Sequence, residues 1–156
     1  MKKNRVRSAA KAIIVEAGKL LVLKMEGVPG EGPWYALPGG GQKAGETLEE
    51  ALRRECLEEL GLEVEVGPLR FVRDYIASHH EFATDEGDAH QVDHLFTCTI
   101  LRRAAESGPK PDQRQLDVAW LPVKDLENYP LWPKVLRHLI RCLDLEPHLG
   151  YLGDVN

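Results

Sequence analysis

The stretch that decides the fold is residues 38–62, PGGGQKAGETLEEALRRECLEELGL. It reads as a glycine-rich loop followed by a strongly specified helix. Thr47 is a good N-cap, and Glu50, three positions later, can complete a capping box with it. Gly61 stands where a left-handed residue would end the helix. The stretch therefore predicts a loop that leads into a helix capped at both ends.

One side of the predicted helix is apolar. Its members recur every four residues or flank those that do: Leu48, Leu52, Cys56 and Leu60, with Ala51 and Leu57 beside them. Such a stripe covers about 100° or more of the helix surface. We therefore expect this side of the helix to pack against the body of the protein.

The acidic residues of this helix admit two interpretations. Glu55, Glu58 and Glu59 have the spacing i, i+3, i+4, so their side chains can converge on one side of the helix. Ordinary solvated charge explains Glu58, which alternates in sign with Glu50 and Arg54 along the helix. It explains Glu55 and Glu59 less well, because like charges four residues apart repel and Glu59 lies near the apolar stripe. A bound cation would remove that repulsion.

The cation that fits this cluster is a hard one. Carboxylate oxygens without nearby His or Cys ligands indicate Mg²⁺ or Mn²⁺. Mg²⁺ typically takes one or two carboxylates and leaves its other positions to water and substrate phosphates. The glycines at 39–41 lie just upstream, where the backbone can approach a metal or a phosphate without a Cβ in the way. A triple glycine alone is also common in plain turns, so the acidic cluster carries this prediction.

The same residues carry a resemblance to a known family. Gly40, Glu46 and the run 54–62 (RECLEELGL) match the signature of the Nudix hydrolases, with Cys56 where a bulkier aliphatic residue is usual. The resemblance implies an α/β fold, a Nudix-type α/β/α sandwich with a mixed β-sheet. It also implies a divalent-metal-dependent hydrolase of the pyrophosphate bond in a nucleoside diphosphate linked to another moiety. That compound would be a nucleotide sugar, ADP-ribose or a modified nucleoside triphosphate.

The resemblance also assigns roles to individual residues. It implies that Glu55, Glu58 and Glu59 ligate Mg²⁺ (or Mn²⁺), with the carbonyl of Gly40 as a further ligand. Two more residues resemble the pair that braces the loop against the helix: Arg54 and Glu46. Together these carboxylates and the bracing pair form the expected catalytic set.

Six further residues are candidate substrate contacts: Arg7, Trp34, Glu86, Asp88, His90 and Asp93. Arg7 belongs to a basic N-terminal stretch that could reach a phosphate, and Trp34 could stack on a base or pack on the core. Three of the six fall in the long acidic loop 77–90, which is either solvated or a flap over the site. The proton acceptor stays open between the helix carboxylates Glu58 and Glu59 and the acids of this loop.

The rest of the chain is expected to supply strands and a second helix. The predicted strands cover residues 9–16, 19–24, 34–38, 63–66, 69–76, 91–101 and 116–121, and the predicted helix covers 133–145. The runs 12–15 and 20–23 are almost continuously apolar, as in central strands covered on both faces. The tail 146–156 is expected to fold back only loosely. This order of elements fits a mixed sheet with a helix over each face.

Length and composition fit a single domain over residues 1–156. The net charge of −5 argues against generic nucleic-acid binding, which needs a broad basic surface. The sequence has no apolar run of about 18 or more residues and no signal-peptide core, so we expect a cytoplasmic protein. Its three cysteines lie far apart and are expected to be free thiols in a reducing compartment.

Two other functions stay open. One is a non-catalytic, nucleotide-sensing binding module of the Nudix fold, although such modules usually lose carboxylates that this sequence keeps. The other is an RNA 5′-end pyrophosphohydrolase, which the acidic balance disfavours. The expected partner is a small-molecule nucleoside diphosphate derivative, with no membrane and with nucleic acid disfavoured. The oligomeric state stays open between a monomer and a homodimer, although dimers are common in families that this one resembles.

Overall fold

The structure is a computed structural model that describes residues 5–80, 87–104, 113–145 and 150–156. Its elements follow one another in the order β1 (Arg7–Ile13), β2 (Val15–Glu16), β3 (Lys19–Met25), β4 (Trp34–Ala36), β5 (Gly39–Gly41), α1 (Leu48–Leu60), β6 (Leu62–Ile76), η1 (Ala77–His79), β7 (His90–Arg103), β8 (Gln115–Pro122), η2 (Val123–Asn128), β9 (Leu131–Trp132), α3 (Val135–Arg141) and β10 (Gly150–Asp154). None of the helices within these ranges combines the length and the apolar character needed to cross a bilayer.

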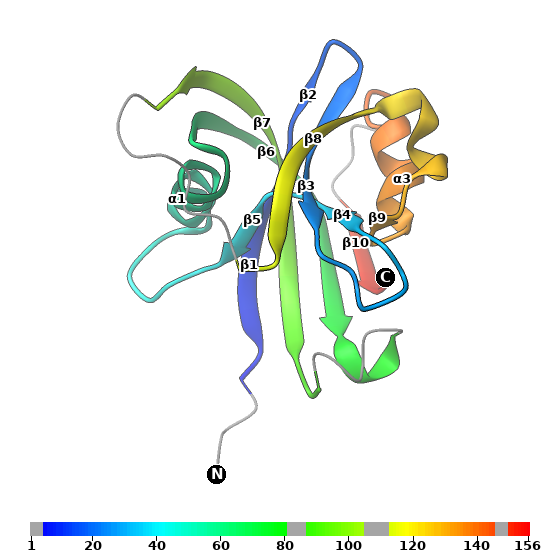
Figure 1. Ribbon diagram of the computed structural model, residues 1–156. Helices are drawn as coiled ribbons and strands as arrows, with labels where there is room; N and C mark the ends of the chain where they lie inside the picture. The colour runs from blue at the N-terminus through cyan, green and yellow to red at the C-terminus, as the bar shows by residue number, and fades with distance from the viewer. Residues whose placement is uncertain (1–4, 81–86, 105–112, 146–149) are drawn as a thin grey trace.

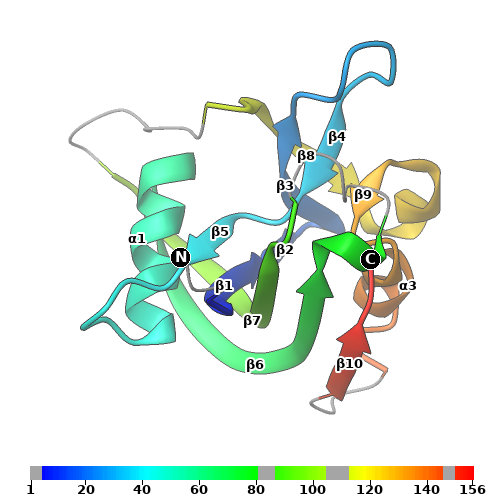
Figure 2. The same cartoon turned by 90° about the horizontal axis from the view of Figure 1, so that it is seen from below.

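The strands form two sheets, each with parallel and antiparallel pairs. The first has the order β10-β6-β7-β1-β5, and the second has the order β2-β3-β4-β9 with β8 paired to β3. Strand β1 runs parallel to β7 and antiparallel to β5. Helix α1 lies on one side of these strands and α3 on the other (Figures 1 and 2). This arrangement confirms the predicted α/β fold with mixed sheets between helices.

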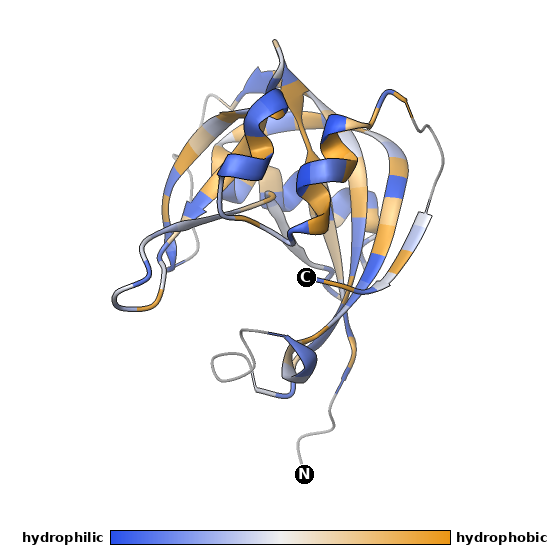
Figure 3. Cartoon of the chain, turned by 90° about the vertical axis from the view of Figure 1, so that its right-hand side faces the viewer, coloured by the Kyte–Doolittle hydropathy of each residue, from blue (hydrophilic) through white to orange (hydrophobic). Residues whose placement is uncertain are grey.

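Two hydrophobic clusters fill the two sides of the central strands. Leu21 and Leu23 point to the cluster that contains residues of α1, whereas Leu20 and Val22 point to the cluster that contains Leu136 of α3. Hydrophobic residues are correspondingly frequent along the strands in Figure 3. Residues 12–14 and 20–23 are therefore buried on both faces, as predicted for central strands, whereas Val15, at the end of the first predicted run, is 40% exposed.

Helix α1 begins and ends as its sequence predicts. The Oγ1 of Thr47 accepts the backbone N–H of Glu50 (3.2 Å), and the carboxylate of Glu50 accepts the backbone N–H of Thr47 (2.7 Å). Gly61 ends the helix with a φ of 65°. Leu57 is the exception to the predicted stripe, because it is 43% exposed. It lies one residue, or about 100°, beyond Cys56 and so turns away from the core.

Three predictions for the chain after α1 are wrong. The dipeptide 67–68 does not end a strand, because β6 continues through it with shifts of pairing register, a feature of β-bulges. Helix α3 covers only residues 135–141 of the predicted 133–145. The described part of the C-terminal tail is not loose, because β10 pairs in parallel with β6, and Gly150 lies opposite Phe71.

Side chains hold β10 at one end of the first sheet. Asp154 accepts hydrogen bonds at 2.7 Å and 2.6 Å from the rings of His79 and His80, and another from the backbone N–H of Ile76 (3.1 Å). The hydroxyl of Tyr151 donates to Asp74. Partial burial raises the pKa of Asp154, but its hydrogen bonds outweigh this effect and lower the pKa to about 2.

We expect Thr47→Ala to lower the free energy of unfolding by about 1 kcal/mol, because it removes the oxygen that satisfies the first turn of α1. Thr47→Ser is the matched control, since it keeps that oxygen. Chemical denaturation of the two variants checks the prediction. Equal stabilities would show that the cap contributes nothing.

We expect the contact between Asp154 and the two histidines to stabilise the fold above pH 3.8, the ordinary pKa of the carboxyl, and to be lost as pH falls through about 2. The reason is that the folded chain holds the carboxylate ionised at a pH where the unfolded chain protonates it. Asp154→Asn should therefore lower the thermal midpoint at pH 7 and make the midpoint less sensitive to pH between about 4 and 2. If the thermal midpoints of the variant and the parent fall equally steeply with pH in this range, Asp154 does not cause the pH dependence.

Candidate active site

The residues singled out in the acidic helix lie in a cleft of about 500 Å³. The cleft is lined by Arg7, Lys11, Leu23, Met25, Trp34, Ala36, Leu37, Gly39, Gly40, Glu55, Glu58, Glu59, Gln91 and Arg114. Its wall thus combines the three predicted carboxylates and Gly40 with basic and apolar side chains. No other described cleft brings those four residues together.

The glycines bring the backbone of β5 close to β1 and to α1. A Cβ at Gly39 would overlap the backbone carbonyl oxygen of Ala10, and the φ of Gly39 is 132°. A Cβ at Gly40 would lie only 2.6 Å from the carboxyl carbon of Glu55. Glycine is therefore required at Gly39 by backbone packing, and at Gly40 it leaves space for a carboxylate.

The three carboxylates have different surroundings. Glu59 is only 7% exposed, and its Oε1 accepts the backbone N–H of Gly39 at 2.7 Å. Glu55 accepts a hydrogen bond of 2.7 Å from Arg54. Glu58 lies 3.4 Å from the same guanidinium, and 40% of its side chain is exposed. Glu58 is therefore the carboxylate most open to solvent and the one most weakly held by its neighbours.

Arg54 joins the loop to the helix. Its guanidinium donates to both carboxylate oxygens of Glu46 (2.7 Å and 3.1 Å) and to the carbonyl of Gly41 (3.0 Å). The hydrogen bond from Arg54 lowers the pKa of Glu46 to about 2, and the same bond raises the pKa of Arg54. These two residues have the positions of a structural brace. The neighbouring thiol of Cys56 is buried, which raises its pKa, so it stays protonated and cannot act as a nucleophile.

The donor set of the cleft suits a hard divalent cation. Glu55, Glu58 and Glu59 offer carboxylate oxygens, and Gly40 adds a backbone carbonyl with no side chain to shield it. In the part of the chain that the structure describes, no three His, Cys, Asp or Glu side chains stand close enough to form a ready cage. Two of the carboxylates are instead engaged by Arg54 and by Gly39. Ion binding would therefore exchange these hydrogen bonds for coordination.

Three cationic side chains line the same cleft: Arg7, Lys11 and Arg114. Arg7 was predicted as a phosphate contact, and its guanidinium lies against Gly41. Lys11 donates to the carbonyl of Gly39 at 3.4 Å. Lys11 and Arg114 were missed, although a lysine in the middle of an otherwise apolar strand was a signal for Lys11. Together these residues supply positive charge beside the carboxylates.

Trp34 is the one predicted base contact on the cleft wall. It is half-buried, and its indole N–H donates to the carbonyl of Glu26 at 3.1 Å. Asp88 is exposed in a turn and is not among the described residues that line the cleft. Glu86 lies outside the described residues. The structure therefore does not place Asp88 at the cleft, and the role of Glu86 stays a prediction.

The structure places His90 and Asp93 away from the cleft wall. His90 Nε2 lies 2.8 Å from a carboxylate oxygen of Asp74. Asp93 is only 1% exposed and accepts a hydrogen bond from Arg73 at 2.8 Å. Its other oxygen accepts the side-chain amide of Gln91, which does line the cleft. Asp93 thus does not line the cleft but contacts Gln91, a residue that does. Gln91 itself was missed because it looked like an ordinary polar strand residue.

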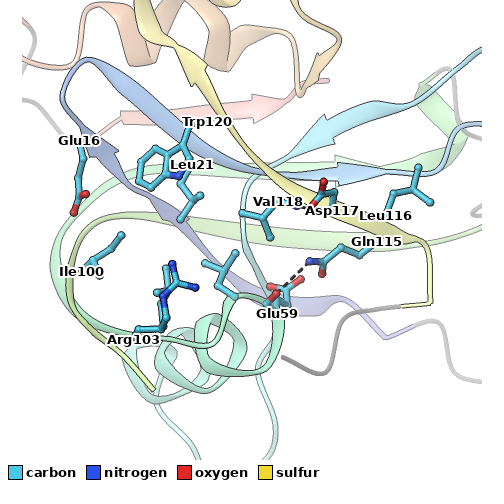
Figure 4. Close-up of a pocket in the computed structure, with 12 residues that line it drawn as sticks. Glu16, Leu21, Glu59, Ile100, Arg103, Gln115, Leu116, Asp117, Val118 and Trp120 are labelled. Carbon is cyan, nitrogen blue, oxygen red and sulfur yellow. Dashed lines mark hydrogen bonds between the residues drawn. The ribbon is translucent and has the colours of Figure 1, made fainter. Parts of the chain in front are cut away.

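A second cleft, of about 710 Å³, also includes Glu59 in its wall (Figure 4). It lies between β8, the end of α1 and the end of β7, and Trp120 and Arg103 line it. The side-chain amide of Gln115 donates to the backbone carbonyl of Glu59 there (3.1 Å). Glu55, Glu58 and Gly40 do not line this cleft. The smaller cleft is therefore the candidate active site.

Comparisons with known proteins agree with this geometry. The NUDIX domain family model matches residues 5–142. The nucleoside triphosphatase NudI of Escherichia coli O139:H28 (strain E24377A / ETEC) is 34% identical over 131 residues, which cover 81% of this chain and 89% of that protein. The protein of the same name from Shigella flexneri matches equally well.

Solved structures show the same fold at lower identity. A NUDIX hydrolase from Nitrosomonas europaea superposes with a TM-score of 0.72 at 16% identity, over 90% of both chains. A UDP-X diphosphatase gives a TM-score of 0.70 at 20% identity, over 99% of this chain and 70% of that one. The match of the family model over most of the chain is the decisive finding. The chain belongs to the Nudix hydrolase family and is a Nudix pyrophosphohydrolase.

Proposed function

We propose that this enzyme uses Mg²⁺ or Mn²⁺ to hydrolyse the pyrophosphate bond of a nucleoside triphosphate or of another nucleoside diphosphate derivative. The observation that carries the proposal is one cleft lined by Glu55, Glu58, Glu59 and Gly40 together with cationic side chains. A polyphosphate chain and a hard cation need these two kinds of group side by side. Nucleoside triphosphates come first among the substrates, because the 34% identical relatives are named as nucleoside triphosphatases.

The residues that would hold the ion are Glu55, Glu58, Glu59 and the carbonyl of Gly40. Their oxygen-only donor set favours Mg²⁺ or Mn²⁺ over zinc. When bound, such an ion neutralises phosphate charge and lowers the pKa of water at the site. Arg54 is already hydrogen-bonded to Glu55 and close to Glu58, so it keeps these side chains on the cleft side of the helix before an ion arrives.

Side chains of the cleft would also bind the substrate and accept the proton from water. Arg7 and Lys11 would bind phosphate oxygens and orient the scissile bond. Glu58 would take the proton from the attacking water, because its carboxylate is more exposed than those of Glu55 and Glu59. Trp34 would form the apolar wall against which the nucleoside rests.

The partner in this proposal is a small-molecule nucleotide. A cytoplasmic location fits the free thiols of Cys56, Cys98 and Cys142, which oxidising compartments tend to convert to disulfides. A homodimer remains a prediction. Incubation of the enzyme with nucleoside triphosphates, nucleotide sugars and ADP-ribose, with Mg²⁺ or Mn²⁺, tests the proposal through the phosphate released with and without added phosphatase. Hydrolysis of none of them would contradict it.

We expect Glu58→Gln to lower kcat by at least about 100-fold, because the amide cannot accept the proton. Binding of nucleotide should persist, since the side chain keeps its shape. Glu49→Gln is the matched control, because Glu49 lies in the first turn of the same helix and pairs only with the exposed Arg53 among the described residues. Unchanged turnover of Glu58→Gln would refute the assignment. Nucleotide binding by the wild-type enzyme without any turnover would favour a binding module instead.

Two neighbouring glycine substitutions should have different effects. The three atoms nearest to the new methyl of Gly40→Ala belong to the flexible end of Glu55, so the thermal midpoint should change little while the displaced carboxylate lowers turnover by up to about 100-fold. Gly39→Ala meets the backbone of β1 at a positive φ and should destabilise the fold by more than about 1 kcal/mol. Thermal unfolding and phosphate release measured on both variants check this. A fully active Gly40→Ala enzyme would show that Gly40 has no role in the site.

A further inference from the structure

Gln91 is the one neutral polar side chain among the residues that line the candidate active site. It sits near the start of β7, where its backbone pairs in parallel with Arg7 of β1. Its neighbours on the wall include carboxylates, cations and apolar groups. Because this amide carries no charge, it attracts a metal or a phosphate less strongly than its charged neighbours do, and it can form a directional hydrogen bond to a neutral group.

The amide of Gln91 is held in one orientation. Its Nε2 donates to Oδ1 of Asp93 at 2.7 Å. The other oxygen of Asp93 accepts from Nε of Arg73 at 2.8 Å, and both residues are buried. An ionised carboxylate only accepts hydrogen bonds, so the NH₂ group of Gln91 must face Asp93 and its carbonyl oxygen must face elsewhere. The opposite orientation would set two acceptors against each other.

The buried ion pair is itself anchored to the end of the chain. The guanidinium of Arg73 also donates to the backbone carbonyl of Val155 at 2.7 Å. Arg73 and Asp93 lie opposite each other on β6 and β7, so the pair is fixed by the sheet register. A planar guanidinium held by two acceptors has little freedom to move. The orientation of Gln91 is therefore set before any ligand binds.

No described residue donates a hydrogen bond to Oε1 of Gln91. That oxygen belongs to a side chain on the cleft wall, and its NH₂ group is directed into the protein at Asp93. We propose that Oε1 of Gln91 accepts a hydrogen bond from an N–H or O–H group of the nucleoside, and that Asp93 and Arg73 are positioning residues for it. The inference rests on the proposed function and deepens it, because it names a residue that selects the nucleoside.

The oriented oxygen of Gln91 would make the enzyme select nucleosides that carry a hydrogen-bond donor at this point. A nucleoside that offers a donor at this point satisfies the oriented oxygen, whereas one that presents an acceptor or nothing leaves it desolvated and unpaired. The base edge and the ribose hydroxyls both carry such donors. Comparison of ribonucleotides with 2′-deoxyribonucleotides separates these two sources.

The test measures binding of the α,β-methylene analogues of ADP, GDP, CDP and UDP to the wild-type enzyme with Mg²⁺, by titration calorimetry. These analogues cannot be cleaved at the bridging position, so affinity is read apart from catalysis. Gln91→Leu should raise the Kd of the tightest-binding analogue about tenfold, the factor typical of one lost hydrogen bond. Gln113→Leu removes the same amide from an exposed turn and should leave the Kd unchanged.

The 2′-deoxy form of that analogue identifies the donor. If the effect of Gln91→Leu persists with the deoxy form, the donor is on the base or is another hydroxyl. If the deoxy form binds both proteins equally weakly, the donor is the 2′-hydroxyl. Equal Kd values of Gln91→Leu and the parent for all analogues would overturn the inference while leaving the proposed function intact. Absence of both binding and hydrolysis in the parent would overturn both.

An exchange of the two side chains tests the positioning role. Gln91→Glu alone places a carboxylate against Asp93 and should weaken binding at least about tenfold. The double variant Gln91→Glu with Asp93→Asn restores one donor and one acceptor, so binding should recover to within about threefold of the parent. Circular dichroism confirms that each variant is folded. If the binding free energy lost in the double variant equals the sum of the losses in the two single variants, Asp93 has only a structural role.

Discussion

The structure depends on the close approach between the glycine strand β5 and helix α1. Gly39 reaches the buried carboxylate of Glu59 through its backbone N–H, and Gly40 leaves the space that the carboxylate of Glu55 occupies. The same strand is hydrogen-bonded to β1 on its other side. A side chain at either glycine would push the strand or the carboxylate away. This contact therefore couples the packing of the first sheet to the placement of the acidic residues.

The acidic residues are tolerated on α1 because each lies close to a hydrogen-bond donor. Arg54 links Glu46 in the loop to Glu55 on the helix, and it lies within 3.4 Å of Glu58. The carboxylate of Glu59 is stabilised by a hydrogen bond from the backbone N–H of Gly39. The arrangement stabilises the site before a cation binds, and it leaves Glu58 as the most exposed carboxylate. An ion and its substrate can thus enter a cleft whose walls are already in place.

Local features were predictable from the sequence because their causes are local. The cap at Thr47, the end of α1 at Gly61 and the buried central strands follow from side-chain chemistry and periodicity, and the structure agrees. The family resemblance and the fold class are confirmed as well. The prediction that Leu57 belongs to the apolar side of α1 was wrong, because the buried side of the helix is narrower than predicted. Glu50 caps the helix and does not act mainly as a partner for Arg54.

What the sequence could not show depends on contacts between distant segments. The pairing of β10 with β6 joins residues that lie far apart in the chain. The tail has no alternation of polar and apolar residues that would predict a strand there. Asp93 was expected in the pocket, but the sheet register turns it to Arg73 and leaves Gln91 at the wall. The roles of the carboxylates toward a metal remain predictions.

Everything proposed for this enzyme requires that Glu55, Glu58, Glu59 and Gly40 hold a hard divalent cation. A crystal grown with Mn²⁺ and an uncleavable nucleotide tests it most directly, through the anomalous difference density of the metal. We expect a peak bounded by the three carboxylates and the carbonyl of Gly40, with the nucleotide phosphates beside it. A cleft with bound nucleotide and no metal peak at these residues, or a peak held by other groups, would contradict it.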